Sequence, residues 1–448
     1  MKFYRKIYQV NIKLASPLSV GSGVNGNTDK DIIVDGCGIP FIPASSLAGV
    51  LRSYVAANRG RALENALFGS LADSKEAGSS PDAQNLEYAG GKSLVRVYDG
   101  ICVSKDLNDC FITVRDMVAL KNKVGIDGAK FDMEAVETGA RFTAFIELLQ
   151  PAVSYKTERG VETADISAEI DAALSAMNAG RLRLGTKTTR GYGAVTLCVQ
   201  AISFNNVDEW LGFDMMDPKT WQNAPVYSLK DDCVLKLTLG LHLKGGISIR
   251  EYTTAPGNGE ETMPDYMQLS LHTAFSDGEA EPVIPGTSWA GAVRARFTEL
   301  AGDNGDMADE LFGFVPKSKT DKGGTVRKST ILFSESRLRG GKWKQTTRNA
   351  IDRFTAGTKN NALYTERTYY GGETELEIYF PKEPTVEQKL LLCACFADLH
   401  NGYLSVGGLT AVGRGLFTIG AVNGVELSKE EKKPENIFER LKKEAGVA

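Results

Sequence analysis

Two segments of the chain share a helix start of the kind that binds phosphate. Residues 40–52 read PFIPASSLAGVLR, and residues 282–294 read PVIPGTSWAGAVR. In each segment prolines fix a turn and small residues follow, so an anion can reach the free N–H groups and the positive dipole end of the helix. An arginine two turns into each helix would bind the same anion. The candidate phosphate-binding residues are Ser45, Ser46 and Arg52 in the first segment and Thr287, Ser288 and Arg294 in the second.

A simpler interpretation fits either segment taken alone. Serine and threonine hydroxyls cap helices by accepting hydrogen bonds from the first N–H groups, and an arginine further along the helix can simply be solvated. Retention of the whole pattern in both halves of the chain favours a binding role over this interpretation.

A glycine-rich loop near the end of each half could also lie close to a ligand. Residues 184–197 read LGTKTTRGYGAVTL, and residues 406–419 read VGGLTAVGRGLFTI, with three glycines at matching positions. Glycine permits a positive φ and a close approach of the backbone. Lys187 and Arg190 add positive charge to the first loop, and Arg414 adds it to the second. A tight hairpin turn explains the same glycines without a ligand.

These matching segments indicate an internal repeat. The two proline segments share seven identities in thirteen positions at an offset of 242, and a Leu-Phe-Gly triplet follows each of them. We therefore predict two homologous domains, 1–205 and 230–425. Residues 206–229 are predicted to be a linker, and 426–448 a charged C-terminal tail with a short exposed helix.

Each half has the periodicity of a mixed α and β fold. Strands are predicted at 7–14, 141–149, 233–243 and 375–380, and a helix is predicted to start at 45 and at 287. Helices between antiparallel strands indicate an α+β fold, here two ferredoxin-like units with insertions. Residues 70–92, rich in Ser, Ala, Gly and Asp, are predicted to be a flexible insertion.

Composition excludes several classes of protein. The 448 residues are 42% hydrophobic and 24% charged, a globular balance, and no apolar run approaches the roughly 20 residues of a membrane span. Seven scattered cysteines and three histidines indicate neither a disulfide framework nor a structural zinc site. A net charge of −4 excludes a uniformly basic protein. We expect a soluble, reduced, cytoplasmic protein that binds no membrane.

One local basic run is compatible with nucleic-acid binding. Residues 317–353 contain eleven Lys or Arg and three acidic residues, as expected of a surface that follows phosphates. We predict that Arg348 and Arg353 bind RNA, and that Trp343, Tyr369 and Tyr370 stack on bases. The alternative is a solvated loop.

The ordered set of motifs resembles the RAMP superfamily of CRISPR-associated proteins. Residues 26–52 (GNTDKDIIVDGCGIPFIPASSLAGVLR) and 347–380 (TRNAIDRFTAGTKNNALYTERTYYGGETELEIYF) are similar to the crRNA-binding backbone subunits of type III effector complexes, and 114–148 is a weaker counterpart. The resemblance implies two tandem ferredoxin-like (RRM-like) RAMP domains with thumb-like hairpins. It also implies the partners: a crRNA, a target RNA and the other subunits of the complex.

The same resemblance implies a catalytic carboxylate. In such subunits a loop aspartate ahead of the proline turn assists cleavage of the target RNA, and Asp29 occupies that position, with Asp31 as an adjacent alternative. Asp29 would bind Mg²⁺ or another divalent cation. In the second half the matching position is Leu271, and the nearest upstream carboxylate is Asp265, which fits if an insertion follows it. His272 lies in the same stretch.

Three functions therefore compete. The favoured one is an endoribonuclease subunit that binds guide RNA and cleaves the complementary target in a metal-assisted attack by the 2′-hydroxyl. The second is a structural crRNA-binding or capping subunit without catalysis. The third, a guide-processing endonuclease of the same superfamily, is disfavoured because such enzymes often use a histidine near the N-terminus, and the first histidine here is His242.

Overall fold

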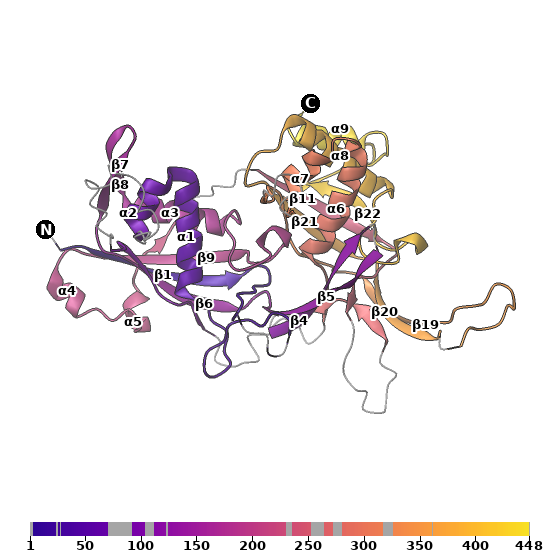
Figure 1. Cartoon of the computed structure of the whole chain (residues 1–448), viewed down its shortest axis with the longest axis horizontal. Helices are drawn as coiled ribbons and strands as arrows, with labels where there is room; N and C mark the ends of the chain where they lie inside the picture. The colour runs from indigo at the N-terminus through magenta and orange to yellow at the C-terminus, as the bar shows by residue number, and fades with distance from the viewer. Residues whose placement is uncertain are drawn as a thin grey trace, which may run out of the picture.

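The computed structural model consists of two halves of similar construction that lie side by side (Figure 1). It describes residues 3–23, 26, 28–69, 92–103, 112–121, 124–229, 235–251, 264–271, 280–316, 326–360 and 362–447. Nearly all of the predicted insertion at 70–92 lies outside the described residues, as do His272 and the lysines at 317, 319 and 322.

The first half is built on an antiparallel sheet with two helices against it. Its elements follow in the order β1 (Arg5–Leu14), α1 (Ala44–Arg59), β2 (Val95–Val97), β6 (Arg141–Leu148), α3 (Ile166–Asn178) and β9 (Val195–Phe204). In the sheet the strands lie in the order β10-β9-β1-β6-β2, with β1 antiparallel to both β6 and β9. The central strand is therefore the first one in the chain.

The second half repeats this arrangement. Its elements are β11 (Lys236–Lys244), α6 (Gly286–Ala301), β17 (Leu332–Phe333), β21 (Glu373–Tyr379), α8 (Val386–Asn401) and β22 (Leu416–Val422). The sheet order is β17-β21-β11-β22-β23, again with the first strand in the centre. The predicted α+β class is confirmed, and the elements fall in the same order in both halves.

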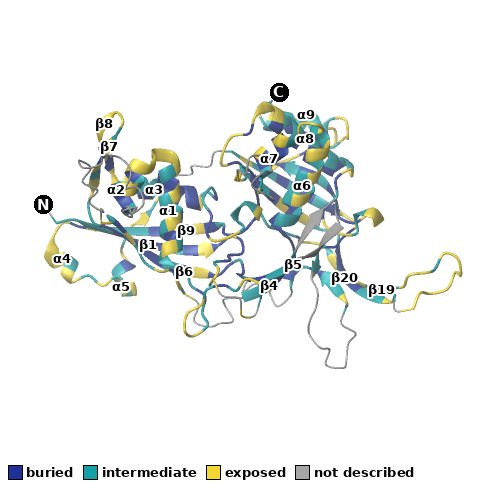
Figure 2. Ribbon diagram, in the orientation of Figure 1, coloured by how far each residue is buried: buried dark blue, intermediate teal, exposed yellow. Residues whose placement is uncertain are grey.

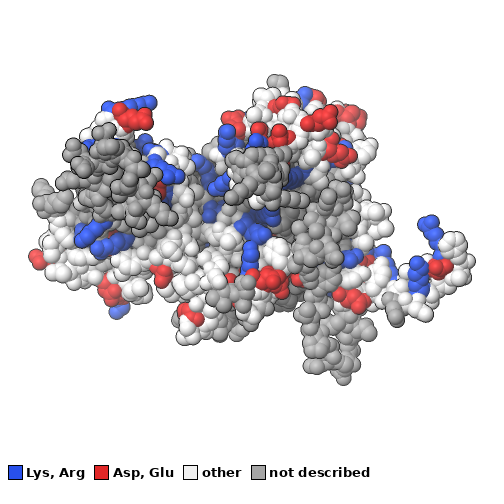
Figure 3. Space-filling model, viewed as in Figure 1, with Lys and Arg blue, Asp and Glu red and all other residues white. Residues whose placement is uncertain are grey.

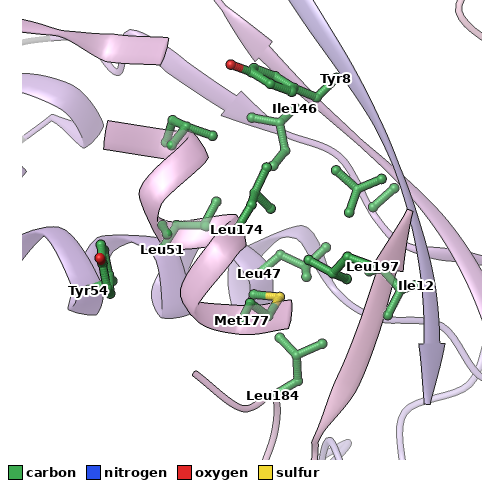
Figure 4. Close-up of a cluster of buried hydrophobic side chains, with 14 of the residues drawn as sticks. Tyr8, Ile12, Leu47, Leu51, Tyr54, Ile146, Leu174, Met177, Leu184 and Leu197 are labelled. Carbon is green, nitrogen blue, oxygen red and sulfur yellow. The ribbon is translucent and has the colours of Figure 1, made fainter. Parts of the chain in front are cut away.

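Alternating apolar residues place the core of the first half between its sheet and its helices. On β1, the side chains of Tyr8, Val10 and Ile12 are buried, while α1 contributes Leu47 and Leu51. Figure 4 shows Tyr8, Ile12, Leu47 and Leu51 converging with Leu174 and Met177 of α3. Burying one such side chain contributes about 1.5–3 kcal/mol relative to leaving it exposed, so this cluster fixes the loop that follows β1 and the glycine-rich loop that precedes β9.

Long hairpins and short elements extend from the two sheets. The first hairpin is β4 (Ile112–Lys121) with β5 (Val124–Val136), and the second is β19 (Lys342–Arg348) with β20 (Tyr364–Tyr370), which projects from the body (Figure 1). The other strands are β3 (Ile101–Cys102), β7 (Ala152–Thr157), β8 (Gly160–Asp165), β10 (Val226–Tyr227), β12 (Gly246–Ile247), β13 (Arg250–Glu251), β14 (Tyr266–Gln268), β15 (Ser270–Leu271), β16 (Glu281–Ile284), β18 (Ser336–Arg337) and β23 (Val425–Glu426). The other helical segments are α2 (Arg61–Phe68), α4 (Val207–Leu211), α5 (Pro218–Trp221), α7 (Gly305–Phe312), α9 (Ile437–Glu444) and the 3₁₀ turns η3 (Thr188–Arg190) and η5 (Thr410–Val412).

The segment predicted to be a linker is folded. Residues 206–229 form α4, α5 and β10, and β10 pairs with β9 at the edge of the first sheet. The segment packs aromatic residues, including the buried Trp221, against Phe145 on the sheet face opposite α1 and α3. The linker prediction rests on the prolines, the acidic residues and the lack of a sustained period in this segment, and it leaves out the aromatic residues. A segment with two tryptophans and a phenylalanine has enough apolar area to cover a sheet.

The C-terminal segment also packs on the fold. The predicted short charged helix is α9, but its Ile437 and Leu441 are buried in the second core. Glu439 and Lys443 on its other face are exposed, and Figure 2 shows exposed residues along the outer rim of this half. Within the described residues, no helix combines the length and the apolar character that a membrane crossing requires.

Candidate functional site

The loop that follows β1 is held against the thumb-like hairpin β4–β5. The backbone N–H of Asp29 donates to Oδ1 of Asp132 (2.8 Å), and the N–H of Asp132 donates to Oδ2 of Asp29 (3.1 Å). Two residues further along β5, Oε2 of Glu134 accepts from the N–H of Ile32 (3.0 Å). This reciprocal pairing places two carboxylates next to each other, with Asp29 exposed.

Asp31 has a different role from Asp29. Its carboxylate accepts hydrogen bonds from the N–H of Gly26 (2.5 Å), the N–H of Thr28 (2.8 Å) and the hydroxyl of Thr28 (2.8 Å). A short aspartate side chain that bonds nearby backbone in this way fixes a turn. Asp31 thus shapes the loop, and Asp29 is the carboxylate that the loop presents to solvent.

Two lysines lie beside this loop at one aromatic ring. Lys187 Nζ lies 4.7 Å and Lys30 Nζ 5.8 Å from the centroid of the Phe131 ring, next to Asp132. Burial, followed by repulsion from Arg190 and Lys30, lowers the pKa of Lys187 to about 8. We call Asp29, Asp132, Lys30, Lys187 and Arg190 the first-repeat site. It combines carboxylates for a cation with ammonium and guanidinium groups for a phosphate.

The second half holds a partial counterpart of this site. Asp265 donates its N–H to the carbonyl of Thr365 (2.8 Å), and its Oδ2 accepts from the N–H of Thr365 (2.7 Å). Since β20 is the counterpart of β5, Asp265 stands in the place of Asp29. The neighbouring position holds Thr365 where the first repeat has Asp132. Leu271, which the ungapped alignment matches to Asp29, is buried in β15.

The two glycine-rich loops have the same backbone conformation but differ in charge. Lys187 and Leu409 occupy the same position with φ of 56° in both. A Cβ on Gly193 or Gly415 would lie 1.9 Å from the carbonyl oxygen of Leu184 or Val406, so neither glycine tolerates a side chain. The loops therefore have the same structure, and only the first carries a lysine at its bend.

The helix starts do not use the predicted hydroxyl caps. Helix α1 begins at Ala44 with Pro43 as its N-cap, and α6 begins at Gly286 after Pro285; neither has a side-chain cap. The proline φ and ψ, near −60° and 140°, already give the extended geometry of an N-cap. Ser45, Ser46, Thr287 and Ser288 therefore lie inside the first helical turn. The N–H of Ala44 donates instead to Oδ1 of Asp99 (2.6 Å).

The two matching arginines, which are predicted phosphate ligands, brace helix pairs in the structure. Arg52 pairs with Glu64 of α2 (2.5 Å), and its Nη2 donates to the carbonyl of Gly69 (3.1 Å). Arg294 pairs with Asp309 of α7 (2.8 Å). In both halves the guanidinium binds a carboxylate of the next helix, which lies within reach of its side chain.

We expect Arg294→Ala to lower the unfolding temperature slightly without changing RNA affinity or its salt dependence. The pair is partly exposed, and such pairs contribute about 0.2–1 kcal/mol. Thermal unfolding and RNA titrations at four salt concentrations measure the two effects. A smaller slope of log K against log salt, by about 0.7 for a lost phosphate contact, would restore the phosphate assignment.

Arg414 is also structural, contrary to its predicted role in binding RNA. It is buried, pairs with the buried Glu366, and lies 5.9 Å from the ring of Tyr370. Arg348 reaches the same carboxylate (3.3 Å) from β19 but remains partly exposed. Arg353 is exposed in the loop of the second hairpin.

The aromatic residues of the second hairpin differ in their accessibility to bases. Tyr369 is buried, and its hydroxyl accepts a hydrogen bond from the N–H of Gly341 (2.8 Å). It is therefore not available for stacking. Trp343 packs edge-on against Tyr369 and lies under the guanidinium of Arg367 at 4.9 Å.

A buried ion-pair network joins the two halves. Arg115 of β4 contacts Glu137 of its own half (Nη2–Oε1, 2.8 Å) and Glu335 of the other half (Nη1–Oε2, 2.5 Å), and all three side chains are almost fully buried. Burial raises the pKa of Glu335, and the attraction of Arg115 opposes that rise. Figure 3 shows lysine and arginine side chains gathered in the hollow where the halves meet.

The first-repeat site suits a divalent cation that is bound together with a phosphate better than a metal that is held by protein side chains alone. Among the described residues, no three His, Cys, Asp or Glu side chains group closely enough to hold a metal by themselves. Asp29 and Asp132 supply two adjacent carboxylates at the surface, each with one oxygen engaged by a backbone N–H. Mg²⁺ is commonly bound by one or two carboxylates, waters and substrate phosphates, so the donor set suits Mg²⁺ bound together with RNA.

Comparison with known proteins decides the family. The model of the RAMP superfamily matches residues 11–196 and 268–418, which is most of the chain and one region in each half. The chain belongs to the RAMP superfamily. The family inferred from the motifs is thus confirmed, including the two tandem regions.

Other comparisons of this RAMP protein are more distant. No curated protein matches it. Among solved structures, it matches a chain of "Cryo-EM structure of the Type III-B Cmr-beta bound to cognate target RNA" with 18% identity and a TM-score of 0.32. That match covers 45% of this chain and 61% of the other one.

Proposed function

We propose that this RAMP protein is a guide-RNA-binding backbone subunit of a type III CRISPR effector complex that cleaves complementary target RNA. The proposal is carried by one observation: in a chain with two RAMP regions, Asp29 is exposed beside a thumb-like hairpin and next to a second carboxylate. In both halves the strand order, with the first strand in the centre of an antiparallel sheet, supports the ferredoxin-like (RRM-like) unit.

In this proposal the cations of the first-repeat site hold the RNA backbone. Lys187, Lys30 and Arg190 come from two segments that meet at Phe131, so a phosphate there contacts more than one of them. Phosphate contacts fix the position of the RNA without reading its sequence. The sequence of the target is then selected by pairing with the guide, and the protein determines where the strand is cut.

The carboxylates of the same site orient the reaction. The 2′-oxygen of the target attacks the adjacent phosphorus, the bond to the 5′-oxygen breaks, and the products are a 2′,3′-cyclic phosphate and a 5′-hydroxyl. Asp29 and Asp132 would hold Mg²⁺, which neutralises charge on the scissile phosphate when bound. The backbone bonds between Asp29 and Asp132 keep the two carboxylates in place before RNA arrives.

The test is cleavage of a complementary RNA by the guide-loaded protein. We expect cuts in Mg²⁺ and none in EDTA, with guide binding retained in both. Cleavage that persists in EDTA contradicts the proposed use of a metal, whereas guide binding without cleavage in Mg²⁺ leaves the structural subunit as the correct function.

The pKa of Lys187 predicts how RNA affinity depends on pH. Because the pKa of Lys187 is about 8 in the free protein, the side chain is cationic below pH 8 and neutral above it. A phosphate binds the cation, so RNA affinity should fall as pH rises from 7 to 9, by up to about tenfold per unit above the pKa. Filter binding at constant salt measures this. Lys187→Arg should remove the pH dependence, since arginine stays charged; a wild-type profile that is flat over this range contradicts the contact.

A further inference from the structure

The glycine-rich loop of the first half is fixed against the loop that follows β1. The N–H of Thr186 donates to the carbonyl of Ser19 (2.9 Å), and the N–H of Gly193 donates to the carbonyl of Pro17 (2.8 Å). Because these bonds join backbone to backbone, they hold the bend between them whatever its side chains are. Both ends of the glycine-rich loop are therefore attached to the loop that carries Asp29.

Lys187 stands at the bend of this loop. Its φ of 56° lies in the left-handed region, which residues other than glycine seldom adopt. Leu409 has the same φ in the second half, so the fold sets the backbone at this position and leaves the side chain free to differ. The half that places an ammonium group at the bend is also the half that pairs Asp29 with Asp132.

The hairpin β4–β5 also contacts the side chain of Lys187. Phe131 packs against a small buried cluster that includes Met133 and Tyr192, and Tyr192 belongs to the glycine-rich loop. The ammonium of Lys187 lies 4.7 Å from the centroid of the Phe131 ring, within reach of a cation–π attraction. The residue after Phe131 is Asp132, so the ammonium lies where β5, the glycine-rich loop and the site carboxylates come together.

The cations of the first-repeat site differ in how readily they release a proton. Arg190 stays protonated, because the guanidinium of arginine does not lose its proton in proteins. Lys30 is exposed, whereas Lys187 is half-buried, and burial disfavours the charged form of an ammonium. Burial, followed by repulsion from Arg190 and Lys30, lowers the pKa of Lys187 to about 8, which suits a general acid near neutral pH. The elements packed around Lys187 also carry the carboxylates of Asp29 and Asp132.

We propose that Lys187 is the general acid of target cleavage and that its ammonium gives a proton to the departing 5′-oxygen. This inference rests on the proposed function and supplies the proton that the leaving group needs. The 2′-oxygen bonds to phosphorus and releases its proton to water, the bond from phosphorus to the 5′-oxygen breaks, and that oxygen takes the proton from Nζ. The neutral amine then regains a proton from water.

Two target RNAs, each added to the guide-loaded protein, separate proton donation from phosphate binding. One is ordinary RNA, and the other has sulfur in place of the bridging 5′-oxygen at the cut, since a thiolate leaves without a proton. With Lys187→Arg we expect the ordinary target to be cut about a hundredfold more slowly, because a general acid contributes about 10²–10⁴-fold. Arginine keeps the positive charge, so target affinity should change by less than about twofold, and the sulfur target should be cut within about threefold of the wild-type rate.

The pH dependence of the wild type gives a second measurement. The ratio of the rates on the ordinary and the sulfur target should fall as pH rises from 7 to 9, because neutral Lys187 has no proton to give. The same ratio should be low and constant in Lys187→Arg. Steps that the two targets share, such as deprotonation of the 2′-hydroxyl, cancel in this ratio.

Three results would overturn the proposal. Equal rates of wild type and Lys187→Arg on the ordinary target show that no proton comes from this residue. An equal loss on both targets shows that Lys187 only holds the phosphate. A wild type that cuts neither target contradicts the proposed function itself, and the inference falls with it, whereas the first two results leave cleavage by the first repeat intact.

Discussion

Asp29→Ala should abolish cleavage at one position of the target RNA, by about a hundredfold or more in rate, while changing guide affinity by less than about twofold. The carboxylate repels phosphate in the absence of metal, so its removal does not weaken the ground-state contacts made by Lys187 and Arg190. Its loss does remove a ligand that stabilises charge in the transition state, and losses of one such group commonly cost two to three orders of magnitude. Denaturing gels with end-labelled target measure the rate at each position.

Matched variants of the same loop separate chemistry from loop structure. Asp31→Asn keeps the side-chain size but weakens the bonds from Gly26 and Thr28, so we expect a smaller loss at the same cut. Asp265→Ala should remove a second cut if the second repeat is catalytic, and should have no effect on the first. Unchanged rates at all positions in Asp29→Ala would refute the catalytic assignment.

Arg115→Met should destabilise the fold strongly. It leaves Glu137 and Glu335 buried without their partner, and breaking a buried ion pair in this way costs about 3–5 kcal/mol. The exposed pair of Arg59 with Glu169 (3.0 Å) provides the control, since Arg59→Met should cost about 1 kcal/mol or less. Thermal and urea unfolding, followed for both variants, measure the difference.

The stability of Arg115→Met should depend on pH in one direction. Burial already raises the pKa of Glu335 in the wild type, and loss of the cation removes the attraction that opposes the rise. A carboxyl with a raised pKa in the folded state binds more protons than the unfolded chain does, so stability falls as pH increases. The loss of stability in Arg115→Met should be larger at pH 8 than at pH 5. Adding Glu137→Gln and Glu335→Gln should reduce this loss. A defect of equal size at both pH values contradicts the buried-charge explanation.

The sequence was sufficient to predict the α+β class, the repeat and the strands, because alternation on β1 and β11 and the matched glycines reflect local geometry. It did not reveal the partners of the candidate residues. Asp132 is 103 positions from Asp29 and becomes its neighbour only when β5 packs on the loop. The helix starts predict an anion for Arg52 and Arg294, but the carboxylates that pair with these arginines lie in the next helix of each half.

Some of the missing information was present in the sequence. The positions of Glu64 and Asp309 relative to the matched arginines are similar in the two halves, which is a signal for an ion pair rather than a ligand site. Proline immediately before each helix start also indicated a cap without a hydroxyl. The contact between Arg115 and Glu335 had no local signal, since it depends on how one repeat docks on the other.

The central claim is that this RAMP protein holds a guide RNA, and sequencing the RNA that copurifies with the intact chain tests it most directly. We predict a discrete population of short RNAs of defined length, protected from nuclease, that direct cleavage or binding of complementary RNA in a reconstituted reaction. Purified protein that carries no RNA, or only random fragments of abundant cellular RNA that direct neither binding nor cleavage, would contradict the claim.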